Sequence, residues 1–142
     1  MRAPIALAAL LAASLAAPVQ AQASTQDVVA RGRALFLGQA TTEAPVHLRG
    51  ETRALPASAV RCVNCHVAPK GAEPLGPRLT ADTLLTLASR RGGPASAYDR
   101  DSFCRVLANS VDNTGVVLAK AMPQYQLSDP ECTALWSYLL TQ

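Results

Sequence analysis

Apolar residues recur at helical spacing in several separate segments of the chain. Residues 26–37 place Leu35 and Phe36 on one side, which predicts a helix that ends at Gly38. Gly32 lies inside this helix at a cost of about 1 kcal/mol relative to alanine, so we expect another backbone to cross closely there. Further helices are expected over residues 59–67, over 81–89 with Thr80 as the cap, and from 99 or 102 to 110.

The last predicted helix has the clearest start. Ser128, Pro130 and Glu131 supply a cap residue, a proline in the first turn and a glutamate three residues after the serine, as in a capping box. Apolar residues then follow at core spacing: Leu135, Trp136 and Leu139. No stretch alternates apolar and polar residues for long enough to predict a sheet, so the sequence predicts an all-α fold.

Two stretches show no periodicity. Residues 39–59 and 68–79 are rich in Thr, Pro, Gly and charged residues, which predicts loops, with a short hairpin around residues 49–51. The first loop is long for a compact domain, and loops of that length are usually functional or mobile.

The N-terminus has the pattern of a secretory signal peptide. Arg2 is followed by an Ala/Leu-rich run over residues 5–17 and then by small residues, which predicts cleavage after Ala21, with Ala23 as an alternative site. A retained N-terminal anchor is the less favoured interpretation. Residues 22–142 would then form one periplasmic domain, whose cysteines meet an oxidising compartment.

Composition and charge exclude some classes of function. A net charge of +3, scattered along the chain, lacks the clustered basic face of a nucleic-acid binder. No apolar run reaches the roughly 18 to 20 residues of a membrane-spanning helix. Aromatic residues make up only 4% of the chain, so the core is underfilled unless another group supplies bulk.

The segment Cys62-Val63-Asn64-Cys65-His66 has the C-x-x-C-H spacing of c-type haem attachment. Two thiols three residues apart can reach the two vinyl groups on one edge of a porphyrin and form thioethers. The adjacent imidazole then lies under the iron as the proximal ligand. A covalent haem c would also supply the missing apolar bulk.

Three other interpretations of the motif fit the sequence less well. A redox-active C-x-x-C is typical of a βαβ context, for which the sequence offers no strands. A zinc site needs further ligands at close spacing, whereas His47, Cys104 and Cys132 are all distant. A plain disulfide between the two motif cysteines leaves the histidine unexplained.

Met122 is the candidate for the second axial ligand. It is the only methionine left after signal removal, and it lies 56 residues after His66, just before the last helix. A thioether is a neutral, soft ligand that raises the haem potential. Met122 could instead fill the core, as most methionines do, although Pro123 after it is poorly placed for a helix core. His47, the only other histidine, is interpreted as a solvated surface residue.

Four segments together resemble the class I cytochromes c. In chain order they are Gly32 to Phe36 within residues 31–36, the Cys62-to-His66 motif, Gly76-Pro77-Arg78-Leu79, and Met122-Pro123 through to Tyr138-Leu139. The resemblance spans residues 31–140 and implies a helical fold that closes over one haem. It also implies that the Pro77 carbonyl accepts a hydrogen bond from Nδ1–H of His66 and so orients this ligand.

Two features depart from that family. About two dozen residues separate the first helix from Cys62, where the family has almost none; this 39–59 insertion would cover a haem edge or form a docking surface. Cys104 and Cys132 form an extra pair, and export with an even cysteine count predicts a structural disulfide between them, the alternative being two buried thiols.

A basic cluster around a Gly-Gly-Pro turn offers a second candidate surface. Arg90, Arg91 and Arg100 are interpreted as a solvated face, or as a surface that steers docking onto an acidic partner.

The expected function is a periplasmic one-electron carrier between redox proteins, a dehydrogenase or reductase on one side and an acceptor on the other. Its iron would be six-coordinate, with His66 and Met122 as axial ligands, and the protein would not be an enzyme. One alternative is a dedicated cytochrome subunit of a periplasmic oxidoreductase complex, docking through residues 39–59. A less favoured one is a five-coordinate haem enzyme or sensor, in which Met122 stays off the iron. No nucleic acid and no remaining membrane span are expected.

Overall fold

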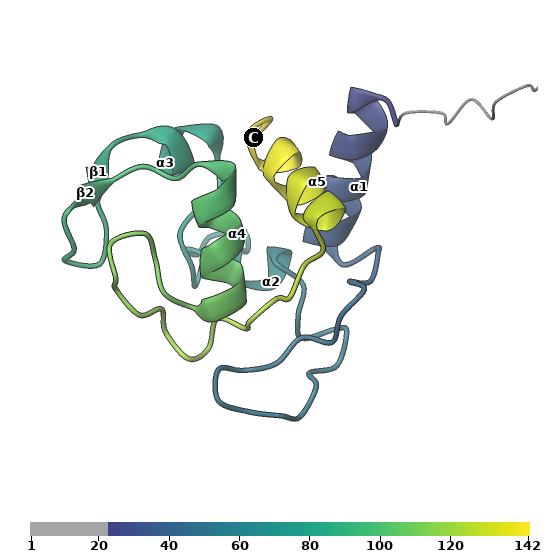
Figure 1. Ribbon diagram of the computed structural model, residues 1–142, viewed down its shortest axis with the longest axis horizontal. Helices are drawn as coiled ribbons and strands as arrows, with labels where there is room; N and C mark the ends of the chain where they lie inside the picture. The colour runs from purple at the N-terminus through teal and green to yellow at the C-terminus, as the bar shows by residue number, and fades with distance from the viewer. Residues whose placement is uncertain (1–22) are drawn as a thin grey trace, which may run out of the picture.

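The computed structural model describes residues 23–142, so the predicted signal peptide over residues 1–21 lies outside the described part. This part is a mostly helical small domain with a two-stranded antiparallel sheet of two residues per strand (Figure 1). Its elements are α1 (Thr25–Leu37), α2 (Val63–His66), α3 (Ala81–Leu85), β1 (Ala88–Ser89), β2 (Ala95–Ser96), α4 (Arg100–Asn109) and α5 (Asp129–Leu139).

The N-terminal and C-terminal helices cross at Gly32, as the sequence predicts. A Cβ atom at Gly32 would overlap the carbonyl oxygen of Ala134 and lie 2.8 Å from Cβ of Tyr138, so only glycine allows this approach of α1 to α5. One turn further along α1, the rings of Phe36 and Tyr138 are 5.6 Å apart. This crossing forms one side of the hydrophobic core, to which α4 contributes Phe103 and Leu107.

Helix α3 is shorter than predicted, ending at Leu85 and not at Ser89. The carbonyls of Thr83 and Thr86 at its end accept hydrogen bonds of 2.6 and 3.0 Å from the Arg90 guanidinium. The chain then turns back as β1 and β2, with Gly92 at φ 79°. A side chain distant by several residues therefore supplies the cap of α3, and helical periodicity alone does not show this.

The three arginines of the basic cluster are used inside the fold. Besides its contacts to α3, Arg90 lies over the ring of Tyr98. Arg91 forms an ion pair of 2.7 Å with Asp112, whose side chain is completely buried. Arg100 contacts residues 101, 129 and 133. These contacts argue against a free basic face at this turn.

Asp112 is expected to make unfolding acid-dependent. Burial raises the pKa of its carboxyl, but hydrogen bonds from Thr114, the Val116 amide and Arg91 outweigh this and lower the pKa to about 2, from 3.8. A lowered pKa stabilises the fold above the unfolded-state value, and this contribution is lost as the pH falls from about 4 to about 2. We expect wild type to lose about 2 kcal/mol in that window through this group, measured by urea unfolding at each pH.

Asp112→Asn should remove this part of the pH dependence and lower stability at neutral pH. Asp101→Asn is the matched control, because its side chain is 69% exposed. Equal pH dependence in the two variants would contradict the prediction.

Candidate haem site

The Cys62-to-His66 motif folds as a single helical turn. Cys62 precedes α2, and its carbonyl accepts hydrogen bonds from the amides of Cys65, at 3.2 Å, and His66, at 3.0 Å. Both thiols are free and half-buried, while the side chain of His66 is buried. The turn therefore presents two unbonded thiols beside one buried imidazole.

The residues Gly76 and Pro77 hold the imidazole of His66 in place. Nδ1 of His66 lies 2.7 Å from the Pro77 carbonyl oxygen, which can only accept, so Nδ1 carries the proton and donates. The Gly76 amide donates to the Cys65 carbonyl at 2.8 Å. A Cβ at Gly76 would lie 2.8 Å from Cε1 of the imidazole, so glycine is needed for this ring to pack here. The contact that the resemblance implies for Pro77 is present.

The other ring nitrogen of His66 is buried and without a hydrogen-bond partner among the described residues. Buried unpartnered nitrogen or oxygen atoms also occur in the side chains of His47, Arg49, Ser96 and Ser110, so this property alone does not mark a ligand. A neutral imidazole that donates from Nδ1, however, has its lone pair on Nε2. This is the state of an imidazole that binds a metal through Nε2.

The other interpretations of the motif fit the structure less well. Burial raises the pKa of the Cys62 thiol to about 11, whereas redox-active C-x-x-C cysteines have a lowered thiol pKa. Within residues 23–142, no group of three or more His, Cys, Asp or Glu side chains is placed to hold a metal ion, which disfavours zinc. Cys62 and Cys65 are not bonded to each other. Attachment to haem uses both cysteines and the histidine.

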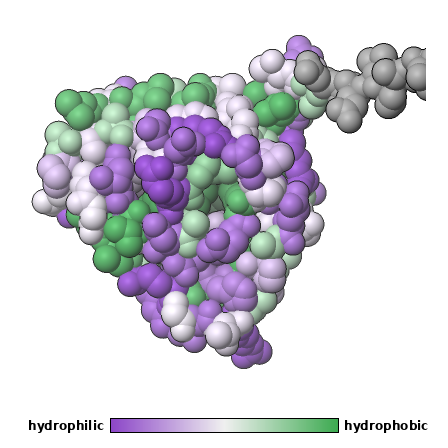
Figure 2. All heavy atoms as spheres, in the orientation of Figure 1, coloured by the Kyte–Doolittle hydropathy of each residue, from purple (hydrophilic) through white to green (hydrophobic). Residues whose placement is uncertain are grey.

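A cavity of about 380 Å³ lies next to Cys62, lined mostly by apolar residues and also by Thr41, Thr42, Glu43 and Arg61. Leu107 of α4, Leu135 of α5 and Tyr125 line it, together with Val46 of the 39–59 insertion. Figure 2 shows a hollow on one face of the molecule, with apolar residues at its base and hydrophilic residues around its rim. The cavity therefore lies beside one of the two motif thiols, and Cys65, His66 and Met122 are not among the residues that line it.

Met122 lies in the loop that precedes α5. It is half-buried and, like Cys62, packs against the core cluster that contains Tyr125 and Leu135. The following Pro123 is buried, and the Met122 amide donates to the Ala119 carbonyl at 3.0 Å. The structure thus places Met122 and the motif against one core cluster, and ligation of iron by Met122 stays a prediction.

His47 is not the solvated residue that the sequence analysis describes. It is half-buried, and its Nδ1 is buried without a partner among the described residues. Its backbone pairs with Ala54 and with Gln124, two residues after Met122. The reason for the error is that this pairing is between segments far apart in the sequence, and no local pattern shows it.

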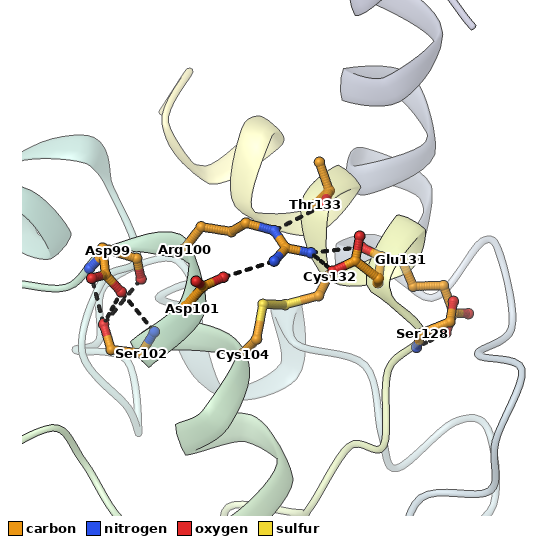
Figure 3. Close-up of a disulfide and its surroundings, with 10 residues drawn as sticks. Asp99, Arg100, Asp101, Ser102, Cys104, Ser128, Glu131, Cys132 and Thr133 are labelled. Atoms are coloured by element: carbon orange, nitrogen blue, oxygen red, sulfur yellow. Dashed lines mark hydrogen bonds and ion pairs between the residues drawn. A yellow bond between two sulfur atoms is a disulfide. The ribbon is translucent and has the colours of Figure 1, made fainter. Parts of the chain in front are cut away.

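The predicted disulfide between Cys104 and Cys132 is present and joins α4 to α5 (Figure 3). The two Cα atoms are 6.0 Å apart, and Cys132 is only 2% exposed. The same region carries the capping contact at the start of α5, where the amide of Ser128 donates to Glu131 at 3.0 Å. Cys104 and Cys132 lie far from the Cys62-to-His66 motif in the sequence, and their disulfide has a structural role.

Tyr125 and Glu131 make contacts that the sequence pattern does not predict. The Tyr125 hydroxyl donates to the Val60 carbonyl at 2.7 Å, and burial raises the pKa of this hydroxyl. Glu131, 2% exposed, accepts from the Glu43 amide at 2.9 Å and lies 3.6 Å from Arg31. A capping box predicts only the local contact of Glu131, and nothing in the sequence pattern points to Tyr125.

Gly76→Ala is expected to disturb His66 directly. The added methyl must displace the imidazole or the backbone, so we expect a loss of about 1 to 3 kcal/mol in the free energy of unfolding. The Nδ1–H proton of His66 should exchange faster with solvent in NMR spectra. The control is Leu75→Ala, because Leu75 is 88% exposed, and unchanged proton exchange in Gly76→Ala would contradict the packing described.

No helix within residues 23–142 has the length and apolar character needed to cross a membrane. Comparison of the chain with family models, with curated proteins and with solved structures found no match.

Proposed function

We propose that this protein is an exported monohaem c-type cytochrome that carries single electrons between redox proteins. Cys62 and Cys65 would hold haem c through thioethers, and His66 and Met122 would bind its iron. The observation that carries the proposal is the state of His66: a buried imidazole, fixed by donation from Nδ1 to Pro77, with its Nε2 lone pair unpartnered. Bound haem supplies reversible one-electron chemistry at iron.

The residues around His66 and Met122 suit electron transfer without substrate chemistry. Donation from Nδ1 to the Pro77 carbonyl fixes the ring and raises the basicity of Nε2 as a ligand. A thioether at the second position would favour the reduced iron and leave no open site for dioxygen or peroxide. The protein would therefore pass electrons on without being an enzyme itself.

The dedicated-subunit alternative has one observation in its favour. Four large apolar side chains between residues 67 and 87 are exposed, as a partner contact would require: Val67, Leu75, Leu85 and Leu87. They lie outside the 39–59 insertion, which the sequence analysis names as the docking element. Co-purification of a larger redox protein would favour the subunit role, and a stable, isolated carrier would favour the free protein.

Visible spectra of the protein matured in an exporting host test the proposal. Ferric wild type should show the weak far-red band of an iron–thioether bond, and the ferrous form should not bind carbon monoxide. Met122→Ala should lose the band and bind carbon monoxide, whereas His47→Ala, the other candidate side chain near this loop, should retain wild-type behaviour.

Three results would overturn parts of the proposal. Absence of covalent haem, assayed by mass and by alkaline pyridine spectra, would reject it entirely. A wild-type spectrum without the band, with carbon monoxide binding that appears in His47→Ala but not in Met122→Ala, would replace the second ligand. Ready binding of carbon monoxide by wild type would indicate an open iron and favour an enzyme or sensor.

A further inference from the structure

The 39–59 insertion contains a small hairpin over residues 46–55. His47 and Ala54 form an antiparallel bridge, and the Leu55 amide donates to the Val46 carbonyl at 2.8 Å. At the tip, the Glu51 amide donates to the Leu48 carbonyl at 2.9 Å. We call residues 46–55 the strap. The prediction of a short hairpin around residues 49–51 is confirmed.

Three residues of the strap, two positions apart along the first arm and the tip, contact the loop that carries Met122. The amide of His47 donates to the Gln124 carbonyl at 3.3 Å, and the Gln124 amide donates back at 2.7 Å. The side chain of Arg49 donates to the Leu118 carbonyl at 3.4 Å. Glu51 forms an ion pair of 2.6 Å with Lys120. The three contacts fall on both sides of Met122.

The strap is itself anchored in the body of the domain. The side chain of Val46 is 4% exposed and belongs to the core cluster with Leu135 of α5. Just before the strap, the Glu43 amide donates to buried Glu131, also of α5. The strap therefore connects the Met122 loop to α5 and can hold the loop in a fixed position relative to this helix.

Residues 118–124 form few other hydrogen bonds with the rest of the protein. Besides the strap contacts, one hydrogen bond within the described chain joins this segment to another, from the Leu118 amide to the Ser110 carbonyl at 2.8 Å. The remaining bond, from Met122 to Ala119, is internal to the segment. The position of Met122 thus depends mainly on the strap, on Pro123 and on the chain that follows.

We propose that the strap positions the Met122 loop and keeps the methionine thioether on the iron. This inference rests on the proposed function and gives the insertion a role: it holds the second ligand. Arg49 and Glu51 are positioning residues that act through Leu118 and Lys120. An external ligand can bind the iron only while the loop is open, so the rate at which it binds measures how often the loop opens.

The test uses haem-loaded ferric protein and imidazole as the external ligand. In the double variant Arg49→Ala/Glu51→Ala, imidazole binding should be about threefold to tenfold faster than in wild type, because one hydrogen bond and one exposed ion pair are lost. The far-red methionine band should weaken in parallel. Arg53→Ala is the control: Arg53 lies in the same hairpin and is exposed, and its loss should leave both readouts unchanged.

A charge exchange separates positioning from general destabilisation. Glu51→Lys alone and Lys120→Glu alone should each accelerate imidazole binding, by up to about fivefold. The combination Glu51→Lys/Lys120→Glu restores opposite charges and should return the rate toward the wild-type value. A loss of stability unrelated to the Glu51–Lys120 pair would not be reversed by the second substitution.

The outcomes distinguish this inference from the proposed function. If wild type lacks the far-red band, the ligand assignment fails and the strap has no ligand to position. If wild type shows the band but the double variant binds imidazole at the wild-type rate, the strap proposal is overturned while the function stands. Rates that rise equally in Arg53→Ala, or that the charge exchange fails to restore, also reject it.

Discussion

Gly32→Ala is expected to lower the free energy of unfolding by about 3 kcal/mol. The new Cβ would overlap the Ala134 carbonyl oxygen and lie 2.8 Å from Cβ of Tyr138, so α1 and α5 must move apart. This separation would also loosen the contact between Phe36 and Tyr138, whose rings are 5.6 Å apart. Urea unfolding of wild type and the variant, followed by circular dichroism, measures the loss.

The sign of the change in unfolding free energy distinguishes the helix crossing from helix propensity. In an ordinary helix interior, replacing glycine by alanine stabilises by about 1 kcal/mol, so helix propensity and the crossing predict opposite results. Arg33→Ala on the exposed face of α1 is the control and should change stability by less than about 0.5 kcal/mol. A stabilised Gly32→Ala variant would show that α1 and α5 are further apart than described.

Features set by neighbours in the chain were predictable from the sequence. The cap of α5 at Ser128 and the end of α1 at Gly38 follow from local backbone chemistry, and both are present. The close crossing at Gly32 was predictable because a helix bears the cost of a central glycine only where space requires it. The Cys104–Cys132 pair was predictable from the even cysteine count together with the predicted export.

Features set by remote partners were not predictable. The strap has no hydrophobic period because its polar groups bond to residues 118–124, about seventy positions away. His47 was therefore placed in solvent, although its backbone joins two segments. Helix α3 was predicted too long because its last carbonyls bond to the side chain of Arg90, which requires the turn to β1 and β2.

The candidate site also combines local features, which the sequence predicts, with long-range ones, which it does not. The Cys62-to-His66 turn is local, so its spacing alone is enough to predict haem attachment there. The bond between His66 and Pro77 spans 11 residues and came from resemblance to a family, not from periodicity. The prediction of Met122 as a ligand rests on its being the only methionine after signal removal, on thioether chemistry and on the resemblance. The contacts of its loop with residues 47, 49 and 51 are long-range ones that only the structure shows.

Replacing Cys104 and Cys132 together by alanine is expected to lower the free energy of unfolding by about 3 to 4 kcal/mol. The disulfide joins residues 28 positions apart, and in the chain-entropy model its loss frees a loop of that length in the unfolded state. Because Cys132 is 2% exposed, alanine also leaves a small void between α4 and α5. Urea unfolding of wild type and the double variant under non-reducing conditions measures the difference.

Reduction of the wild-type protein provides an independent check. A thiol reductant should lower wild-type stability by nearly the same amount and leave the double alanine variant unchanged. With haem attached as proposed, Cys62 and Cys65 would be thioethers, which thiols do not cleave, so any effect would belong to the Cys104–Cys132 bond. If reductant destabilises the double variant as well, the bond is not its only target. If it leaves wild type unaffected while the variant is destabilised, packing of Cys132 and not the cross-link carries the stability.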